Sequence, residues 1–189
     1  MIYNFRVTLA GIKGFYRVYK VDGGSSLYTF HKRLREDLEF PQDQAILFKG
    51  FDAEGGVVGK YALFDIGFGA VDHISITDTV KAGITNFLYF YDVTARKSVI
   101  ITLEGESAGN VDSPVLVDSK GPVPLEFENG YVAYEDLPDE KRHLPGEKNR
   151  GGGDPDDEDL DDDDDDDENE EEDDDDETEE IYDENEDES

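Results

Sequence analysis

The sequence FLYFYDVTARKSVIITL, residues 87–103, decides the fold of this chain. Its first five residues, 87–91, are all apolar or aromatic, with no polar residue between them. A short apolar run without polar alternation is typical of a strand that is covered on both of its faces. Residues 92–97 then turn the chain, and residues 98–103 return as a second apolar strand. We therefore expect these residues to form a hairpin in the middle of a sheet.

An alternating pattern at the N-terminus predicts a further hairpin. Every second residue from 3 to 9 is apolar, which is the period of a half-buried strand, and residues 15–21 return as a strand rich in aromatic and β-branched side chains. These segments predict an α+β fold with a mostly antiparallel sheet of about five to seven strands. Because the chain opens with a hairpin, a helix and a strand, a β-grasp-like sheet is the alternative. Weaker strand or extended segments are expected at residues 45–48, 57–64, 70–76 and 113–124. Thr77 or Asp78 is expected to cap one turn of helix that runs through Lys81.

The clearest helix follows the first hairpin. One apolar stripe at three- and four-residue spacing predicts a helix over about residues 26–39, packed on one face of the sheet. Either Ser25 or Ser26 is placed to cap its N-terminus. The stripe consists of Leu27, Phe30, Leu34 and Leu38. We expect the solvent-facing side of the helix to carry Lys32, Arg33, Arg35, Glu36 and Glu39.

The negative charge of the chain is concentrated at its C-terminal end. The 189 residues carry a formal net charge of −33, and residues 151–189 contain 28 Asp or Glu and neither Lys nor Arg. Such a segment cannot bury enough apolar surface to offset the cost of ordering its backbone. We therefore divide the chain into an α+β domain at residues 1–125, an extended linker at 126–150 and a disordered acidic tail at 151–189.

Composition also excludes several classes of protein. The sequence contains no Cys, which excludes disulfide scaffolds, thiol catalysis and thiolate metal sites. No apolar run approaches the ~18 residues of a membrane span, and no signal-peptide pattern opens the chain. We therefore expect a cytoplasmic protein that does not contact membranes. The strong negative charge repels phosphates and disfavours direct binding of nucleic acid.

The histidines give no sign of a shared metal or catalytic site. His31, His73 and His143 lie far apart in the sequence and form no pair at helical spacing. His31 borders the apolar stripe of the helix. The favoured interpretation is a partly buried histidine that makes one hydrogen bond, and the alternative is a ligand or a base. We therefore assign no cofactor, no metal and no catalytic residue.

Several segments together carry the pattern of a known family. The matched residues are Tyr3, Phe5, Arg6, Val7, Leu9, Leu27, Phe30, His31, Leu34, Phe40, Asp43, Phe48, Tyr89, Tyr91, Asp92, Ile101, Leu103, Pro114, Gly121 and Pro124. These segments resemble the Ri-plasmid ORF-three-like family, whose domains occur in plasmids, insertion elements and bacterial genomes. The resemblance covers about residues 1–125 and implies a bacterial domain with a family-matched pocket at His31, Tyr91 and Asp92. The family's distinctive G-D-x-W-x-H patch is replaced here by Thr94, Ala95, Lys97 and Val99.

Two functions stay open at this point. The first is an interaction domain without catalytic activity, whose acidic run attracts basic proteins or only keeps the chain in solution. This run consists of Asp161, Asp162, Asp163, Asp164, Asp165, Asp166 and Asp167. The alternative is a degenerate enzyme or a nucleic-acid-associated protein of plasmid or transposon origin. It is motivated by His31, Tyr91 and Asp92, the residues that the family pattern shares with this chain.

Overall fold

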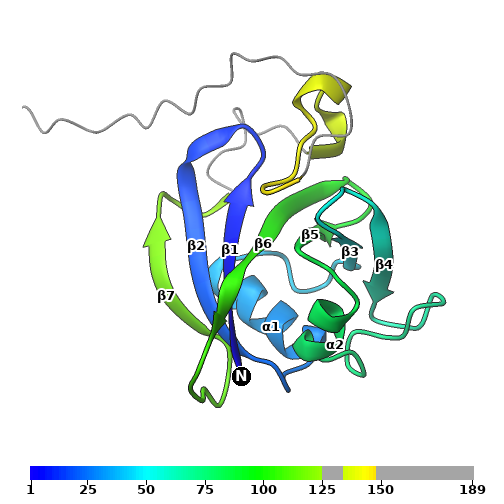
Figure 1. Cartoon of the computed structure of the whole chain (residues 1–189). Helices are drawn as coiled ribbons and strands as arrows, with labels where there is room; N and C mark the ends of the chain where they lie inside the picture. Colours follow the sequence, from blue (N-terminus) through cyan, green and yellow to red (C-terminus); the bar gives the residue numbers. More distant parts are fainter. Residues whose placement is uncertain (125–133, 148–189) are drawn as a thin grey trace, which may run out of the picture. The chain divides into compact units, whose positions relative to one another are not determined.

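Seven strands pair into one sheet, within the residues 1–124 and 134–147 that the computed structural model describes. The strands are β1 (Ile2–Leu9), β2 (Ile12–Asp22), β3 (Leu47–Phe51), β4 (Val57–Ala62), β5 (Asn86–Asp92), β6 (Lys97–Ser107) and β7 (Val115–Lys120). Their order across the sheet is β4-β3-β5-β6-β1-β2-β7, and all neighbouring strands are antiparallel (Figure 1). The α+β class with an antiparallel sheet is confirmed. The β-grasp alternative is wrong, because that fold requires a parallel pair in the centre of the sheet.

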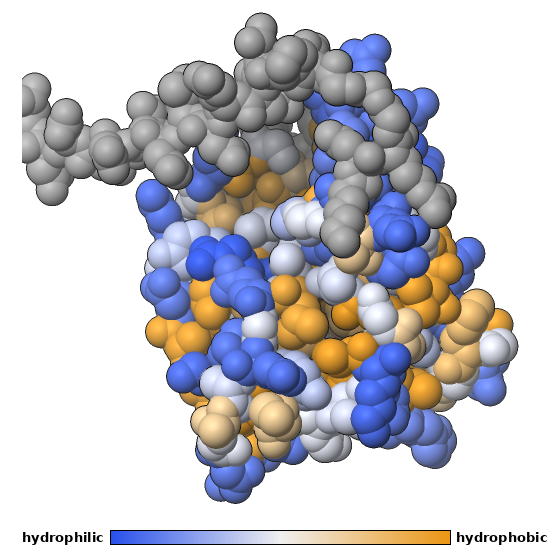
Figure 2. Space-filling view, viewed as in Figure 1, coloured by the Kyte–Doolittle hydropathy of each residue, from blue (hydrophilic) through white to orange (hydrophobic). Residues whose placement is uncertain are grey.

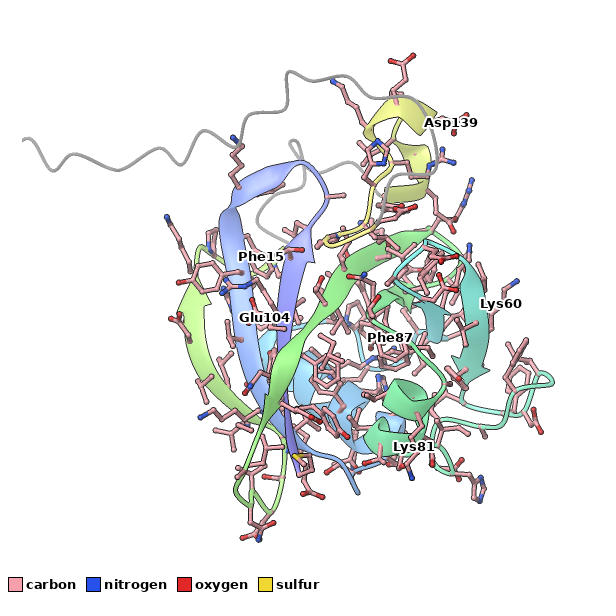
Figure 3. All side chains as sticks on the ribbon, in the orientation of Figure 1. Phe15, Lys60, Lys81, Phe87, Glu104 and Asp139 are labelled. Carbon is pink, nitrogen blue, oxygen red and sulfur yellow. The ribbon has the colours of Figure 1, made fainter. Side chains whose placement is uncertain are left out.

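The central hairpin is formed by β5 and β6, as the sequence predicts. Both faces of β5 are covered, since the side chains of Phe87, Leu88, Tyr89, Phe90 and Tyr91 are all buried. Figure 3 shows Phe87 among the side chains that lie between the sheet and the helices. The apolar run at residues 87–91 is therefore the centre of two separate clusters, one on each side of the sheet.

Both helices of the described residues pack on one face of the sheet (Figure 1). Helix α1 spans Leu27–Asp37, and α2 spans Ile76–Lys81. Ser26 caps α1 by accepting a hydrogen bond from the N–H of Thr29 at 3.2 Å. The cap of α2 is Ser75 and not the expected Thr77 or Asp78, because Ser75 forms a capping box with Asp78.

The apolar stripe of α1 packs as its spacing predicts. Leu27, Phe30, Leu34 and Leu38 are each at most 1% exposed. The ring centroid of Phe30 lies 5.5 Å from those of Phe5 and Tyr19 on the sheet.

The expectation for Arg35 is wrong. Its side chain is only 3% exposed, whereas the sequence places it on the solvent-facing side of α1. Arg35 lies four residues after His31, so both side chains border the stripe on the same side of the helix. The guanidinium is covered by the loop that follows the helix, where it donates a hydrogen bond to the backbone of Gln44.

The opposite face of the sheet is covered by residues 134–147. This segment contains two short 3₁₀ helices, η2 (Tyr134–Asp136) and η3 (Asp139–Lys141), drawn in yellow in Figure 1. Tyr134 and Leu144 are buried in one cluster with Ala10, Phe51, Leu88, Phe90 and Ile100. Part of the range 126–150 thus differs from the extended linker that we expect there, because these side chains remove apolar surface of β5 and β6 from water. The acidic tail lies outside the described residues.

A projecting loop after β4 exposes large apolar side chains. Phe64, Ile66 and Phe68 are 72%, 43% and 49% exposed, and Figure 2 shows apolar surface on this loop. The carboxylate of Asp65 accepts hydrogen bonds from the N–H groups of Gly67 and Gly69, at 2.7 and 2.9 Å. Both glycines adopt positive φ angles that other residues rarely adopt. The Asp65 side chain thus stabilises the conformation of the loop through hydrogen bonds to the loop backbone.

Candidate functional site

A hollow of about 450 Å³ lies beside α1, where the helix meets the loop that precedes β3. We call it the α1 hollow. The helix contributes Tyr28, His31, Lys32 and Arg35. Tyr28 precedes His31 and Lys32 by three and four residues, and Arg35 follows them by four and three, so the four side chains share one side of the helix. The loop at residues 42–45 supplies further wall residues. Its volume falls within the range of roughly 300–1,000 Å³ that is usual for ligand sites.

His31 is joined to the sheet by a buried hydrogen bond. Its Nδ1 atom lies 2.7 Å from the hydroxyl oxygen of Tyr89 on β5. Burial, together with the positive charges of Arg35 and Lys32, lowers the pKa of His31 to about 4. The imidazole is therefore neutral near pH 7. His31 is thus a buried helix histidine whose Nδ1 has Tyr89 as its hydrogen-bond partner.

Tyr89 is itself affected by its neighbours. Burial raises the pKa of Tyr89, and Arg35 offsets part of that rise. Ammonium and guanidinium groups only donate hydrogen bonds. The wall of the α1 hollow thus offers donors from Lys32 and Arg35.

Arg35 has no anionic partner among residues 1–124 and 134–147. Its Nη2 donates to the carbonyl oxygen of Gln44 at 2.6 Å, while its buried Nε has no hydrogen-bond partner. No carboxylate of the described residues lies within 4.0 Å of its side chain. By contrast, Arg33 on the same helix pairs with Asp37 at 2.8 Å. A buried unpaired charge is costly, so Arg35 is the unusual group of this site.

The three residues of the family-matched pocket have different surroundings. The ring of Tyr91 stacks on Phe40 with 3.7 Å between their centroids, and Asp92 accepts a hydrogen bond from the N–H of Ala95 in the turn after β5. Neither Tyr91 nor Asp92 lines the α1 hollow, which His31 does line.

The structure instead brings His31 together with Tyr89 and Arg35. The four-residue spacing of His31 and Arg35 was a usable signal for this pair, because it places both side chains on one side of a helix. The sequence carries no comparable signal for Tyr89. Its partnership with His31 depends on the order of the strands.

The other two histidines make separate contacts elsewhere in the fold. Nδ1 of His73 lies 2.9 Å from the carboxylate of Asp72 at the surface, and Nε2 of His143 lies 2.9 Å from the carbonyl oxygen of Glu140. Within the described residues, no three His, Asp or Glu side chains are grouped as metal ligands. Neither helix there is long and apolar enough to cross a membrane. The acidic run at residues 161–167 lies outside this part of the chain.

Comparisons with known proteins concern the fold alone. No family model matches the chain, and no curated protein matches it. Among solved structures, it is similar to MM3350 from Methanosarcina mazei Go1, a protein of unknown function. The TM-score is 0.51 and the sequence identity is 17%, over 62% of this chain and 68% of that chain. The chain thus shares a fold with MM3350, and this likeness carries no residue role.

Proposed function

We propose that this chain is a binding domain that holds an anion in the α1 hollow without catalysing a reaction. The observation that carries the proposal is Arg35, a buried arginine with an unpartnered Nε and no carboxylate within 4.0 Å among the described residues. An anion beside the guanidinium would supply the missing countercharge. Arginine recognises carboxylates and phosphates with two parallel hydrogen bonds, which suits this arrangement.

The neighbouring groups support an anion and not a cation. Lys32 and Arg35 carry positive charges, and His31 is neutral. Asp43 also lines the hollow and carries one negative charge. The ammonium of Lys32 lies over the ring of Tyr28, 5.1 Å from its centroid, which favours one position of the charge at the entrance. Together these side chains leave the hollow with a net charge of about +1.

The test is a titration of the full chain with sodium acetate at constant ionic strength, followed by ¹⁵N NMR of the Arg35 Nε–H. We expect a saturable shift of this signal, and no such shift when sodium chloride replaces acetate. Arg35→Gln should abolish saturable binding. Lys32→Gln should weaken it about two- to fivefold, as loss of an exposed charge does.

Arg33→Gln is the matched control, because Arg33 lies on the same helix and does not line the hollow. Acetate binding of this variant should equal that of the unmodified chain. Circular dichroism checks that each variant is folded. A linear response of the Arg35 signal, or an equal loss of affinity in Lys32→Gln and Arg33→Gln, would overturn the proposal.

We also propose a second function for the acidic run, on the strength of composition alone. A segment of 28 acids without a basic residue presents a dense negative charge to basic proteins. Binding of a lysine-rich protein should weaken steeply with salt, because exposed charges are screened beyond about 8 Å at physiological ionic strength. Scrambling residues 154–189 should leave binding intact, and replacing residues 161–167 with Asn should weaken it. A tail that only keeps the chain in solution would show no binding at all.

We also propose that the chain belongs to the Ri-plasmid ORF-three-like family. The proposal is supported by matched residues that are buried in the core, such as Phe5, Val7 and Phe30. The alternative of a degenerate enzyme or a nucleic-acid-associated protein lacks the shared pocket that it needs. Its motivating residues, His31, Tyr91 and Asp92, line no common hollow among those described.

A further inference from the structure

A second hollow of about 180 Å³ adjoins the α1 hollow. Ala45 and Leu63 line both, so the two hollows share a wall. All seven residues that line the second hollow are apolar, and Ile46, Phe64 and Val93 are among them. We call it the apolar hollow. It lies where β3 begins and β4 ends, beside the turn that follows β5.

The apolar hollow leaves large apolar side chains in water. Phe64, Leu63 and Val93 are 72%, 47% and 38% exposed. Covering them would remove apolar surface from water, which is the main favourable contribution to binding of an apolar group. The adjacent loop is already held by the hydrogen bonds of Asp65, so a ligand would not have to order it.

We infer that the ligand of the α1 hollow is a carboxylic acid with a small branched apolar group, which fills the apolar hollow while the carboxylate pairs with Arg35. This inference rests on the proposed anion binding and adds the class of ligand. The shared lining at Ala45 and Leu63 is the juxtaposition that carries it, because residues common to both linings make the two hollows neighbours.

The charge balance favours a carboxylate over a phosphate monoester. The hollow has two cations, Lys32 and Arg35, and one carboxylate, Asp43, while His31 is neutral. A monoanion neutralises this set, whereas a dianionic phosphate leaves an excess negative charge beside Asp43. The wholly apolar wall of the second hollow also offers no donor to further phosphate oxygens.

The experiment compares three probes on the full chain by calorimetry and by the Arg35 Nε–H signal. The probes are acetate, 4-methylvalerate and the neutral 4-methylvaleramide. We expect 4-methylvalerate to bind about tenfold or more tightly than acetate, since each buried methylene contributes about fourfold. The amide should show no saturable binding, because it brings no charge to Arg35.

Matched variants connect this preference to the apolar hollow. Val93→Ser should reduce the advantage of 4-methylvalerate over acetate by about fourfold. Val57→Ser is the control, because Val57 is 49% exposed on β4 and does not line the hollow.

An additional pair, N-acetyl-leucine and its amide, represents the end of a peptide chain. If N-acetyl-leucine binds more tightly than 4-methylvalerate, the carboxylate belongs to a peptide C-terminus, and the reverse order indicates a free acid.

The two proposals fail in different ways. Equal affinity for acetate and 4-methylvalerate, with a saturable Arg35 response to both, would overturn this inference and leave anion binding in place. No saturable response to any carboxylate would overturn both. Binding of the amide as tightly as the acid would show that the apolar hollow acts without Arg35, which also contradicts the inference.

Discussion

The Nδ1 atom of His31 lies 2.7 Å from the hydroxyl oxygen of Tyr89, and this contact ties helix α1 to the central strand β5. Both side chains are buried, with 5% and 0% of their surface exposed. A buried polar pair of this kind stabilises the fold only while both partners stay hydrogen-bonded and uncharged. The first two predictions below follow from this condition.

Acid should destabilise the domain through His31. Its pKa is 6.5 in an unfolded chain and about 4 in the fold, so the unfolded chain takes up the proton first as the pH falls. This group therefore has no effect on the free energy of unfolding above pH 6.5. It lowers that free energy between pH 6.5 and 4, by about 3 kcal/mol at most. Urea denaturation at pH 7, 6, 5 and 4 should show a smaller loss in His31→Gln than in the unmodified chain.

Other groups add acid sensitivity, but in a lower window. Hydrogen bonds from Gly67 and Gly69 lower the pKa of Asp65, and bonds with Ser75 lower that of Asp78. Their contribution is present above pH 3.8, the value of an unfolded chain, and is lost below it. They therefore cannot imitate the His31 effect between pH 6.5 and 4. Parallel curves for His31→Gln and the unmodified chain over this range would contradict the assignment.

Tyr89→Phe should lower the free energy of unfolding by about 1–3 kcal/mol, because it leaves Nδ1 of His31 buried without its hydrogen-bond partner. Urea denaturation at pH 7 measures the change. Tyr28→Phe is the control, since Tyr28 is 38% exposed on the same helix and its removal should cost less than about 0.5 kcal/mol. Equal costs in the two variants would show that the buried hydroxyl contributes nothing special.

Leu34→Ala should lower the free energy of unfolding by about 2–4 kcal/mol, because it opens a cavity between α1 and the sheet. Leu34 is fully buried in the larger cluster. Thermal and urea denaturation measure the effect, with Glu36→Ala as the exposed control on the same helix. The side chain of Glu36 is 76% exposed, so this control should change stability by less than about 0.5 kcal/mol. A loss below ~1 kcal/mol for Leu34→Ala would contradict the packing of this helix face.

Two truncations should separate the acidic tail from the segment that covers β5. Ending the chain after residue 150 should leave the thermal midpoint unchanged or slightly higher, because the removed residues bring mutual charge repulsion and few apolar side chains. Ending it after residue 124 should lower the midpoint, because Tyr134 and Leu144 no longer cover Leu88 and Phe90. Differential scanning calorimetry measures both. A clear fall after the first truncation, or none after the second, would contradict this division of the chain.

The parts of the fold that local patterns determine were predictable. The unbroken apolar run of residues 87–91 indicates burial on both faces, and the spacing of Leu27, Phe30 and Leu34 indicates the face of α1. Both signals depend only on neighbours along the chain. These signals are reliable because the periodicity of a strand or a helix places those side chains on one face, independently of how the other strands pair.

The site depends on contacts that local patterns do not contain. Arg35 is buried because the loop after α1 brings the carbonyl group of Gln44 to it, and a helical pattern says nothing of that loop. Tyr89 meets His31 because β5 occupies a central place in the sheet. Tyr134 and Leu144 lie in short 3₁₀ helices and turns, where apolar residues follow no period, so their burial left no trace in the sequence.

Strand β6 joins the two halves of the sheet, since β5 pairs with one of its edges and β1 with the other. In the second pairing Ile2 lies opposite Ser107, so β1 awaits a partner that is synthesised about 105 residues later. At a translation rate of about 5–20 residues per second, that delay lasts roughly 5–20 s. Throughout it, the hairpin of β1 and β2 presents an unpaired edge to other proteins. Because strands distant in the sequence must pair, we expect this domain to fold slowly, on the order of milliseconds to seconds.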